Sequence, residues 1–137
     1  MTTPSQRQVF FDGQGDAWFQ CICQSDADQI SDWSLKDHLV RLLENRTLPR
    51  GLETSVFEVG CGQSLRFARL NSSMGWSVAG LDPSAQAIAA VTAAGYIGVV
   101  GTAGSLSRPD RSVDLLIFGI CLHLSNRDDL FHITAKA

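Results

Sequence analysis

Apolar and polar positions along the chain predict alternating strands and helices from about residue 54 onward. Short apolar runs bounded by glycine, serine or aspartate are typical of buried strands. The expected strands are Ser55–Val59, Trp76–Leu81, Gly95–Val100 and Ser112–Phe118. The expected helices are Leu65–Leu70, Ala85–Ala94 and a last helix that opens with a capping pattern at Ser125–Asp128. Strands separated by helices favour right-handed crossovers, so the predicted fold is α/β with a parallel sheet.

Residues 1–52 form a separate predicted unit, an N-terminal helical leader before the domain at 53–137. Ser34-Leu-Lys-Asp37 has the form of a helix start, with a side-chain cap and an acid three positions later. Leucines follow at helical spacing at positions 35, 39 and 42, and Pro49-Arg50-Gly51 ends the segment. Such a helix packs on the sheet, caps a pocket or lies at an edge, and the pattern leaves these alternatives open.

Composition limits the partners that this domain can have. The chain has 137 residues, 45% of them apolar, which is enough for one layered core. Its net charge is −3 and lysine occurs only at positions 36 and 136, so we expect no nucleic-acid partner. No apolar run reaches membrane-spanning length and the N-terminus lacks the pattern of a secretion signal, so we expect no membrane association and a cytoplasmic location.

The cysteines do not suggest a metal centre. They stand at positions 21, 23, 61 and 121, without a CxxC pair. Cys21 and Cys23 alone have too little reach for an ordinary zinc site, so no metal is expected. Cys61 and Cys121 each follow a predicted strand, where they either line a pocket as small apolar side chains or serve as reduced structural thiols.

Glu58-Val-Gly-Cys-Gly62, at the end of the first predicted strand, indicates a nucleotide site. Two glycines at a strand exit let the backbone approach a ligand closely, and we expect a side chain at Gly60 to fill that space. Asp82 follows about twenty residues later, at the tip of the next strand, where its carboxylate is placed to accept hydrogen bonds from ribose hydroxyls. Leu65 stands where a dinucleotide fingerprint has its third glycine, which disfavours NAD.

With Glu58, Gly60 and Gly62 in place, the chain resembles the class I S-adenosylmethionine-dependent methyltransferases. The resemblance runs from about Val56 to Phe131 and implies a three-layer Rossmann-like sheet that is incomplete, because about four of the family's seven strands are present. It implies that Gly60, Cys61 and Gly62 pass under the methionine part of the cofactor. It also implies that Asp82, followed by Pro83, holds the ribose.

The same resemblance assigns further positions around the cofactor. It places Thr102 and Ala103 beside the adenine, and Gly119 and the residues after it toward the methyl group and the acceptor. His123 is then a candidate general base, or else a packed or capping residue. Trp18, within the aromatic segment Phe10–Phe19, either covers the cofactor or anchors the leader to the core.

These features predict an S-adenosylmethionine-dependent methyltransferase that acts on a small-molecule acceptor. The alternatives are a catalytically inactive cofactor-binding or dimerisation module with the same fold and, third, an NAD-type enzyme. The strand Val113–Phe118 is apolar on both faces and would have one open edge. Because natural proteins normally cover such an edge, we expect a homodimer.

Overall fold

The strands form one parallel sheet. The computed structural model describes residues 6–26, 41, 54–63, 71–72, 74–109, 111–119, 121–122 and 125–135. The strands are β1 (Ser55–Val59), β2 (Ser77–Asp82), β3 (Ile97–Val100) and β4 (Leu115–Phe118). They lie in the order β3-β2-β1-β4 and every neighbouring pair is parallel, which confirms the predicted sheet.

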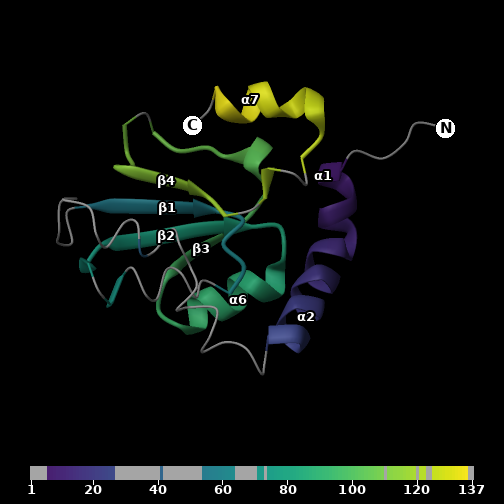
Figure 1. Ribbon diagram of the computed structural model, residues 1–137, viewed down its shortest axis with the longest axis horizontal. Coiled ribbons are helices and arrows are strands. Elements are labelled where there is room, and N and C mark those ends of the chain that lie inside the picture. Colours follow the sequence, from purple (N-terminus) through teal and green to yellow (C-terminus); the bar gives the residue numbers. More distant parts are fainter. Residues whose placement is uncertain are drawn as a thin grey trace.

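Helices on both faces complete three layers (Figure 1). Helix α6 (Ala85–Ala93) covers one face and buries Ala87, Ile88 and Val91. The other face carries α7 (Leu130–Thr134), which follows the 3-10 turn η4 (Arg127–Asp129) and buries Ile133. A shorter 3-10 turn, η2 (Ala103–Ser105), follows β3. The described residues therefore have the expected three-layer Rossmann-like architecture, with four strands among them.

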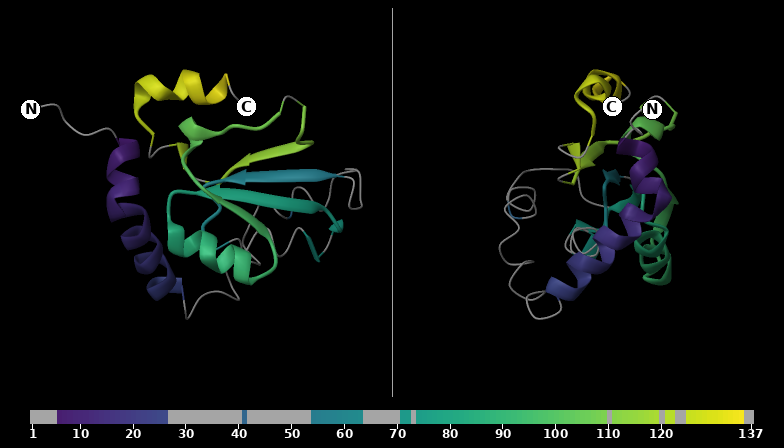
Figure 2. Two further views of the ribbon diagram at one scale, coloured as in Figure 1. Left: turned by 180° about the vertical axis from the view of Figure 1, so that it is seen from behind. Right: turned by 90° about the vertical axis from the view of Figure 1, so that its right-hand side faces the viewer.

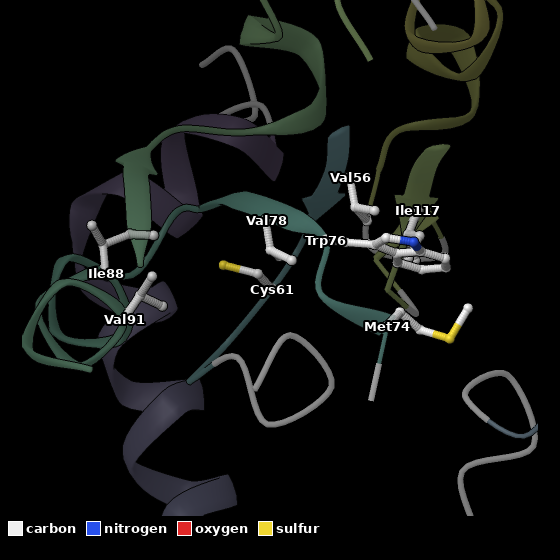
Figure 3. Packing of buried hydrophobic residues seen from close by; sticks show 8 residues of the cluster. All are labelled: Val56, Cys61, Met74, Trp76, Val78, Ile88, Val91 and Ile117. Carbon is white, nitrogen blue, oxygen red and sulfur yellow. The ribbon is translucent and has the colours of Figure 1, made fainter. Parts of the chain in front are cut away.

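Two apolar clusters fill the space between the layers. The cluster on the α6 face consists of Val56, Cys61, Met74, Trp76, Val78, Ile88, Val91 and Ile117 (Figure 3). The cluster on the α7 face consists of Phe57, Val59, Leu81, Ala103, Leu106 and Ile133. Side chains of β1 alternate between the two clusters, as the two-residue period of a strand requires. Burial on both faces accounts for the continuous apolar runs in the sequence.

The leader stands across the carboxyl ends of the strands, as Figures 1 and 2 show from opposite sides. Its described segment at residues 6–26 consists of α1 (Gln6–Val9), a π-helical turn η1 (Phe10–Gln14) and α2 (Gly15–Asp26). Gly13, with φ of +115°, kinks it. No helix of the described segments is long and apolar enough to cross a bilayer. The helices expected from Ser34 and at Leu65–Leu70 lie outside the described residues.

Three strands begin later than the sequence pattern predicts. β2 starts one residue late, at Ser77 rather than Trp76. β3 starts at Ile97 rather than Gly95, because Gly95 adopts φ of +87° in the turn after α6. β4 starts at Leu115 rather than Ser112, because the segment before it is still a turn. Arg111 there has φ of +58° and the Ser112 N–H donates to the carbonyl of Pro109 over 3.2 Å.

The last helix also opens differently from the predicted capping pattern. Asn126, not Ser125, holds the N-cap position of η4, and no side chain caps the turn. The Asn126 side-chain amide instead donates to Asp129 Oδ2 over 3.2 Å. The prediction of a cap at Ser125 was wrong, because the segment starts with a 3-10 turn in which the Asp129 N–H bonds the Asn126 carbonyl over 3.0 Å.

Candidate functional site at the carboxyl end of the sheet

Backbone hydrogen bonds join the exits of all four strands at one edge of the sheet. The N–H groups of Gly60 and Cys61 donate to the carbonyl of Leu81 over 2.7 and 3.1 Å. The N–H of Gly101 donates to the Asp82 carbonyl, and that of Gly119 to the Val59 carbonyl, both over 2.9 Å. The predicted positions after β1, β2, β3 and β4 therefore meet where parallel sheets bind their ligands.

Gly60 is required by the fold rather than by space for a ligand. Its φ is +73°, and a Cβ built on it would lie 2.6 Å from the Cβ of Cys121. The Cys121 thiol donates to the carbonyl of Val59 over 3.3 Å, which fixes it above the loop. The expectation that a side chain at Gly60 would fill ligand space was wrong, because Cys121, in the segment that follows β4, already occupies that space.

The backbone of Gly62 is unobstructed by the described part of the chain. Its φ is +54°, and no described atom lies within 4 Å of a Cβ built on it. Its N–H donates to Asp82 Oδ2 over 2.9 Å, so the loop after β1 is held by the carboxylate at the end of β2. A glycine that is both left-handed and unobstructed leaves room for a ligand to approach the main chain.

Asp82 is half-buried and accepts two hydrogen bonds from the backbone. Its Oδ2 accepts from Gly62 N, and its Oδ1 accepts from Ser84 N, each over 2.9 Å. Desolvation by burial raises the pKa of Asp82 despite these two bonds, and the nearby charge of Asp16 raises it further. Each carboxylate oxygen can accept more than one hydrogen bond, so both retain capacity for a ligand hydroxyl.

Ser84 and Asp16 complete the surroundings of Asp82. Ser84 is the N-cap of α6, where its Oγ accepts from Ala87 N over 3.0 Å. Its hydroxyl also donates to Asp16 of the leader, and Gln86 N donates to the same carboxylate over 3.1 Å. Sequence reasoning gave Asp16 no role. Its position beside Gly15 in the aromatic leader segment was the available signal, but its contacts lie about seventy residues away.

Glu58 is completely buried at the end of β1, with 0% of its surface exposed. It shares the α6 face with its register neighbours Gly80 of β2 and Ile117 of β4. A fully buried carboxylate is energetically costly unless N–H groups or a cation satisfy it. The place of Glu58 just before the glycine loop therefore makes it a candidate member of the site.

The end of β3 offers a hydroxyl and a small side chain. The Thr102 N–H donates to Ser105 Oγ and the Ser105 hydroxyl donates to the Thr102 carbonyl, each over 2.8 Å. Thr102 Oγ1 faces the Ser105 backbone in a capping box but is buried without a hydrogen bond of full geometry among the described residues, so its hydroxyl proton has no acceptor there. The side chain of Ala103 packs in the cluster on the α7 face. Of these two predicted adenine neighbours, Thr102 therefore has free hydrogen-bonding capacity.

The described part of the structure does not place the side chains of three other predicted site residues at the site. The thiol of Cys61 packs in the cluster on the α6 face beside Val78 (Figure 3), so Cys61 can contribute to the site through its backbone. Trp18 lies on α2 and is 52% exposed. His123 lies outside the described residues.

A family model described as methyltransferase domain matches residues 57–134, more than half of the chain. The chain belongs to this family. The matched segment contains the glycine loop, Asp82 and all four strand exits. No curated protein matches the sequence.

Solved structures support the fold at low sequence identity. A complex of the Haloferax volcanii Trm112 methyltransferase activator and a putative methyltransferase matches at TM-score 0.66 and 17% identity, covering 98% of this chain and 55% of that one. The plantazolicin methyltransferase BpumL, solved with a pentazolic desmethylPZN analog and SAH, matches at TM-score 0.66 and 13% identity, covering 94% of this chain and 50% of that one. Haemonchus contortus phosphoethanolamine N-methyltransferase 2, bound to phosphomonomethylethanolamine and S-adenosylhomocysteine, matches at 0.58 and 20%, covering 74% and 25%. This chain thus spans between a quarter and about half of these structures.

Proposed function

We propose that this methyltransferase domain binds S-adenosylmethionine at the carboxyl end of its sheet and transfers the methyl group to a small-molecule acceptor. The observation that carries the proposal is the pairing of Gly62, at which a Cβ would meet no described atom within 4 Å, with the half-buried carboxylate of Asp82, whose Oδ2 lies 2.9 Å from Gly62 N. A bare loop beside a carboxylate with acceptor capacity fits a nucleoside. When bound, the sulfonium supplies an activated methyl group, so the protein has mainly to orient it.

Residues around this pair fit the other parts of the cofactor. We assign the methionine end to the backbone of Gly60, Cys61 and Gly62, with Glu58 close behind the loop. The buried Thr102 Oγ1, which makes no hydrogen bond of full geometry among the described residues, suits an adenine edge, with Ala103 supporting it from the core.

The remaining assignments concern the rim of the site. Pro83 and Gly119 border it at the exits of β2 and β4, and Trp18 on the leader is the candidate cover. His123 is the candidate base that takes a proton from the acceptor. The low lysine content and the net charge of −3 favour a small acceptor over a nucleic acid.

Calorimetric titration of the wild-type chain with S-adenosylmethionine, S-adenosylhomocysteine and NAD tests the cofactor. We expect both sulfur compounds to bind and NAD not to bind. Binding of NAD alone would refute the proposal and indicate a dinucleotide enzyme. If the sulfur compounds bind but no S-adenosylhomocysteine forms from S-adenosylmethionine with any of a panel of small nucleophiles, the result favours the alternative of a catalytically inactive cofactor-binding module.

The proposal includes self-association through the open edge of β4. Among the described strands, β4 pairs with β1 alone, and Phe131 on the adjacent α7 is 85% exposed. We expect sedimentation at micromolar concentration to show a dimer that Phe131→Ser shifts toward monomer. Ile97→Ser, at the opposite edge where Ile97 is 67% exposed, is the matched control. A wild-type monomer would refute the dimer.

A further inference from the structure

We propose that Asp16 of the leader is a positioning residue for the cofactor carboxylate Asp82, so that docking of the leader and binding of the cofactor stabilise each other. This inference rests on the proposed function. It goes further by assigning a role to a residue outside the glycine loop and the strand ends. The leader is then part of the binding site rather than an appendage to the sheet.

The start of α2 is in close contact with the turn after β2. A Cβ built on Gly15 would lie 3.2 Å from both the carbonyl carbon of Pro83 and the backbone nitrogen of Ser84. It would also lie 3.1 Å from the carbonyl oxygen of Phe10 within the leader. These contacts are tighter than most Cβ contacts, so a side chain at residue 15 would push the turn away from α2 by a few tenths of an ångström. The contact places the next residue, Asp16, at the amino end of α6.

Hydrogen bonds continue from Asp16 to the glycine loop. Asp16 Oδ1 accepts from the Ser84 hydroxyl and from Gln86 N. The Ser84 N–H donates to Asp82 Oδ1, and Asp82 Oδ2 accepts from Gly62 N, each over 2.9 Å. A second link between the helices, from Gln20 Nε2 to Gln86 Oε1 over 3.0 Å, holds α2 against α6. The path thus joins three segments that are far apart in the sequence.

The physical basis of the coupling is preorganisation. With Asp16 in place, the Ser84 hydroxyl and the Gln86 N–H have an acceptor, and the negative charge suits the amino end of α6. These bonds also lower the pKa of Asp16, so the carboxylate is ionised at neutral pH. Without Asp16, the Pro83–Ser84 turn can move, and with it the N–H that orients Asp82. A ligand that needs Asp82 fixed then has to order that turn when it binds.

Coupling of this kind is reciprocal. If a docked leader favours the binding of S-adenosylhomocysteine, the ligand must favour the docked leader by the same factor. Hydrogen exchange of the amides in α2 measures the second quantity without any assay of activity. If Asp16 had a purely structural role, its substitution would lower the stability of the fold, but the ligand would have no effect on hydrogen exchange in α2.

The experiment compares Asp16→Ala, Asp16→Asn and the control Asp12→Ala with the wild type. Asp12 belongs to the same leader, but the hydrogen bond of its side chain is to Gln8, over 2.8 Å. We expect Asp16→Ala to raise the Kd of S-adenosylhomocysteine about fivefold to tenfold, within the usual range of coupling between sites. Asp16→Asn keeps an acceptor oxygen and should recover most of the affinity, and Asp12→Ala should bind as the wild type does.

In hydrogen exchange, S-adenosylhomocysteine should slow exchange in α2 of the wild type and have a smaller effect in Asp16→Ala. Unchanged affinity in a folded Asp16→Ala variant would overturn the inference and leave the proposed function intact. If Asp16→Ala fails to fold, the wild-type protein still tests the inference. Hydrogen exchange in α2 that is the same with and without saturating S-adenosylhomocysteine would contradict the coupling. A wild type that binds no S-adenosylhomocysteine would remove the proposed function itself.

Discussion

Asp114 and Asp82 stand at opposite ends of the sheet and accept similar sets of hydrogen bonds. Asp114, just before β4 at the amino end, accepts from the Ser55 N–H over 2.8 Å and from the Ser55 hydroxyl over 3.0 Å. Asp82, at the carboxyl end, accepts from the N–H groups of Gly62 and Ser84, each over 2.9 Å. Asp114 thus ties the start of β4 to β1. Asp82 ties the end of β2 to the glycine loop that follows β1.

Burial makes the two aspartates chemically different. Asp114 is exposed, so the hydrogen bonds from Ser55 outweigh desolvation and lower its pKa. Desolvation of the more buried Asp82 outweighs its hydrogen bonds and raises its pKa. Because Asp114 is exposed, water can satisfy its remaining lone pairs, whereas the half-buried Asp82 has less access to water. The two residues are of the same type and accept the same number of hydrogen bonds. The difference in burial nevertheless makes Asp114 a structural link between strands and Asp82 a candidate binding group.

The largest expected effect separates fold from site within the carboxyl end itself. Gly60→Val should destabilise the domain by about 2–6 kcal/mol, from backbone strain of about 1–3 kcal/mol and a similar term for overpacking against Cys121. Gly62→Val should carry only the strain of about 1–3 kcal/mol and abolish binding of S-adenosylhomocysteine. Urea unfolding and calorimetric titration measure the two quantities. Equal stability of the two variants would contradict the contrast between these glycines.

A smaller effect compares the two aspartates directly. Asp82→Ala should weaken binding of S-adenosylhomocysteine by about 1.5–3 kcal/mol, the usual cost of losing hydrogen bonds to a charged group. Asp114→Ala is the matched control and should leave the Kd unchanged, because it acts at the far end of the sheet. Titration of both variants decides the matter. An unchanged Kd in Asp82→Ala would remove that residue from the site.

The smallest expected effects concern pH. The folded pKa of Asp114 is lowered, so its contribution to stability is present above the ordinary aspartate pKa of about 3.9 and is lost as pH falls through the folded value. For Asp82 the folded pKa is raised, so its contribution is present below about 3.9 and is lost as pH rises through the folded value.

Thermal unfolding between about pH 3 and pH 6 should therefore show opposite changes for the two asparagine variants. Asp114→Asn should lessen the loss of stability on acidification, and Asp82→Asn should enlarge it. Affinity for S-adenosylhomocysteine should fall on acidification at a pH above that typical of an aspartate, since ionised Asp82 is the better acceptor. The same pH profile in both variants would mean that burial does not distinguish them.

Local sequence patterns were enough to predict the sheet. Apolar runs located the four strands, and their spacing by helices implied parallel pairing. Because the carboxyl ends of parallel strands meet at one edge, the approach of Gly62 to Asp82 followed from the order of elements alone. Turn geometry at Gly95 and Arg111 shifted the starts of β3 and β4 by a few residues, which periodicity does not resolve.

Tertiary packing decided what the individual site residues do. Gly60 is constrained by Cys121, about sixty residues away, and Asp16 contacts Ser84 at a similar separation, so no local pattern reveals either contact. The opposite pKa shifts of Asp82 and Asp114 have the same origin. Residue type and position in a strand were readable from the sequence. Burial and partners depend on segments that come together only when the chain folds, and they determine which carboxylate is left to meet a ligand.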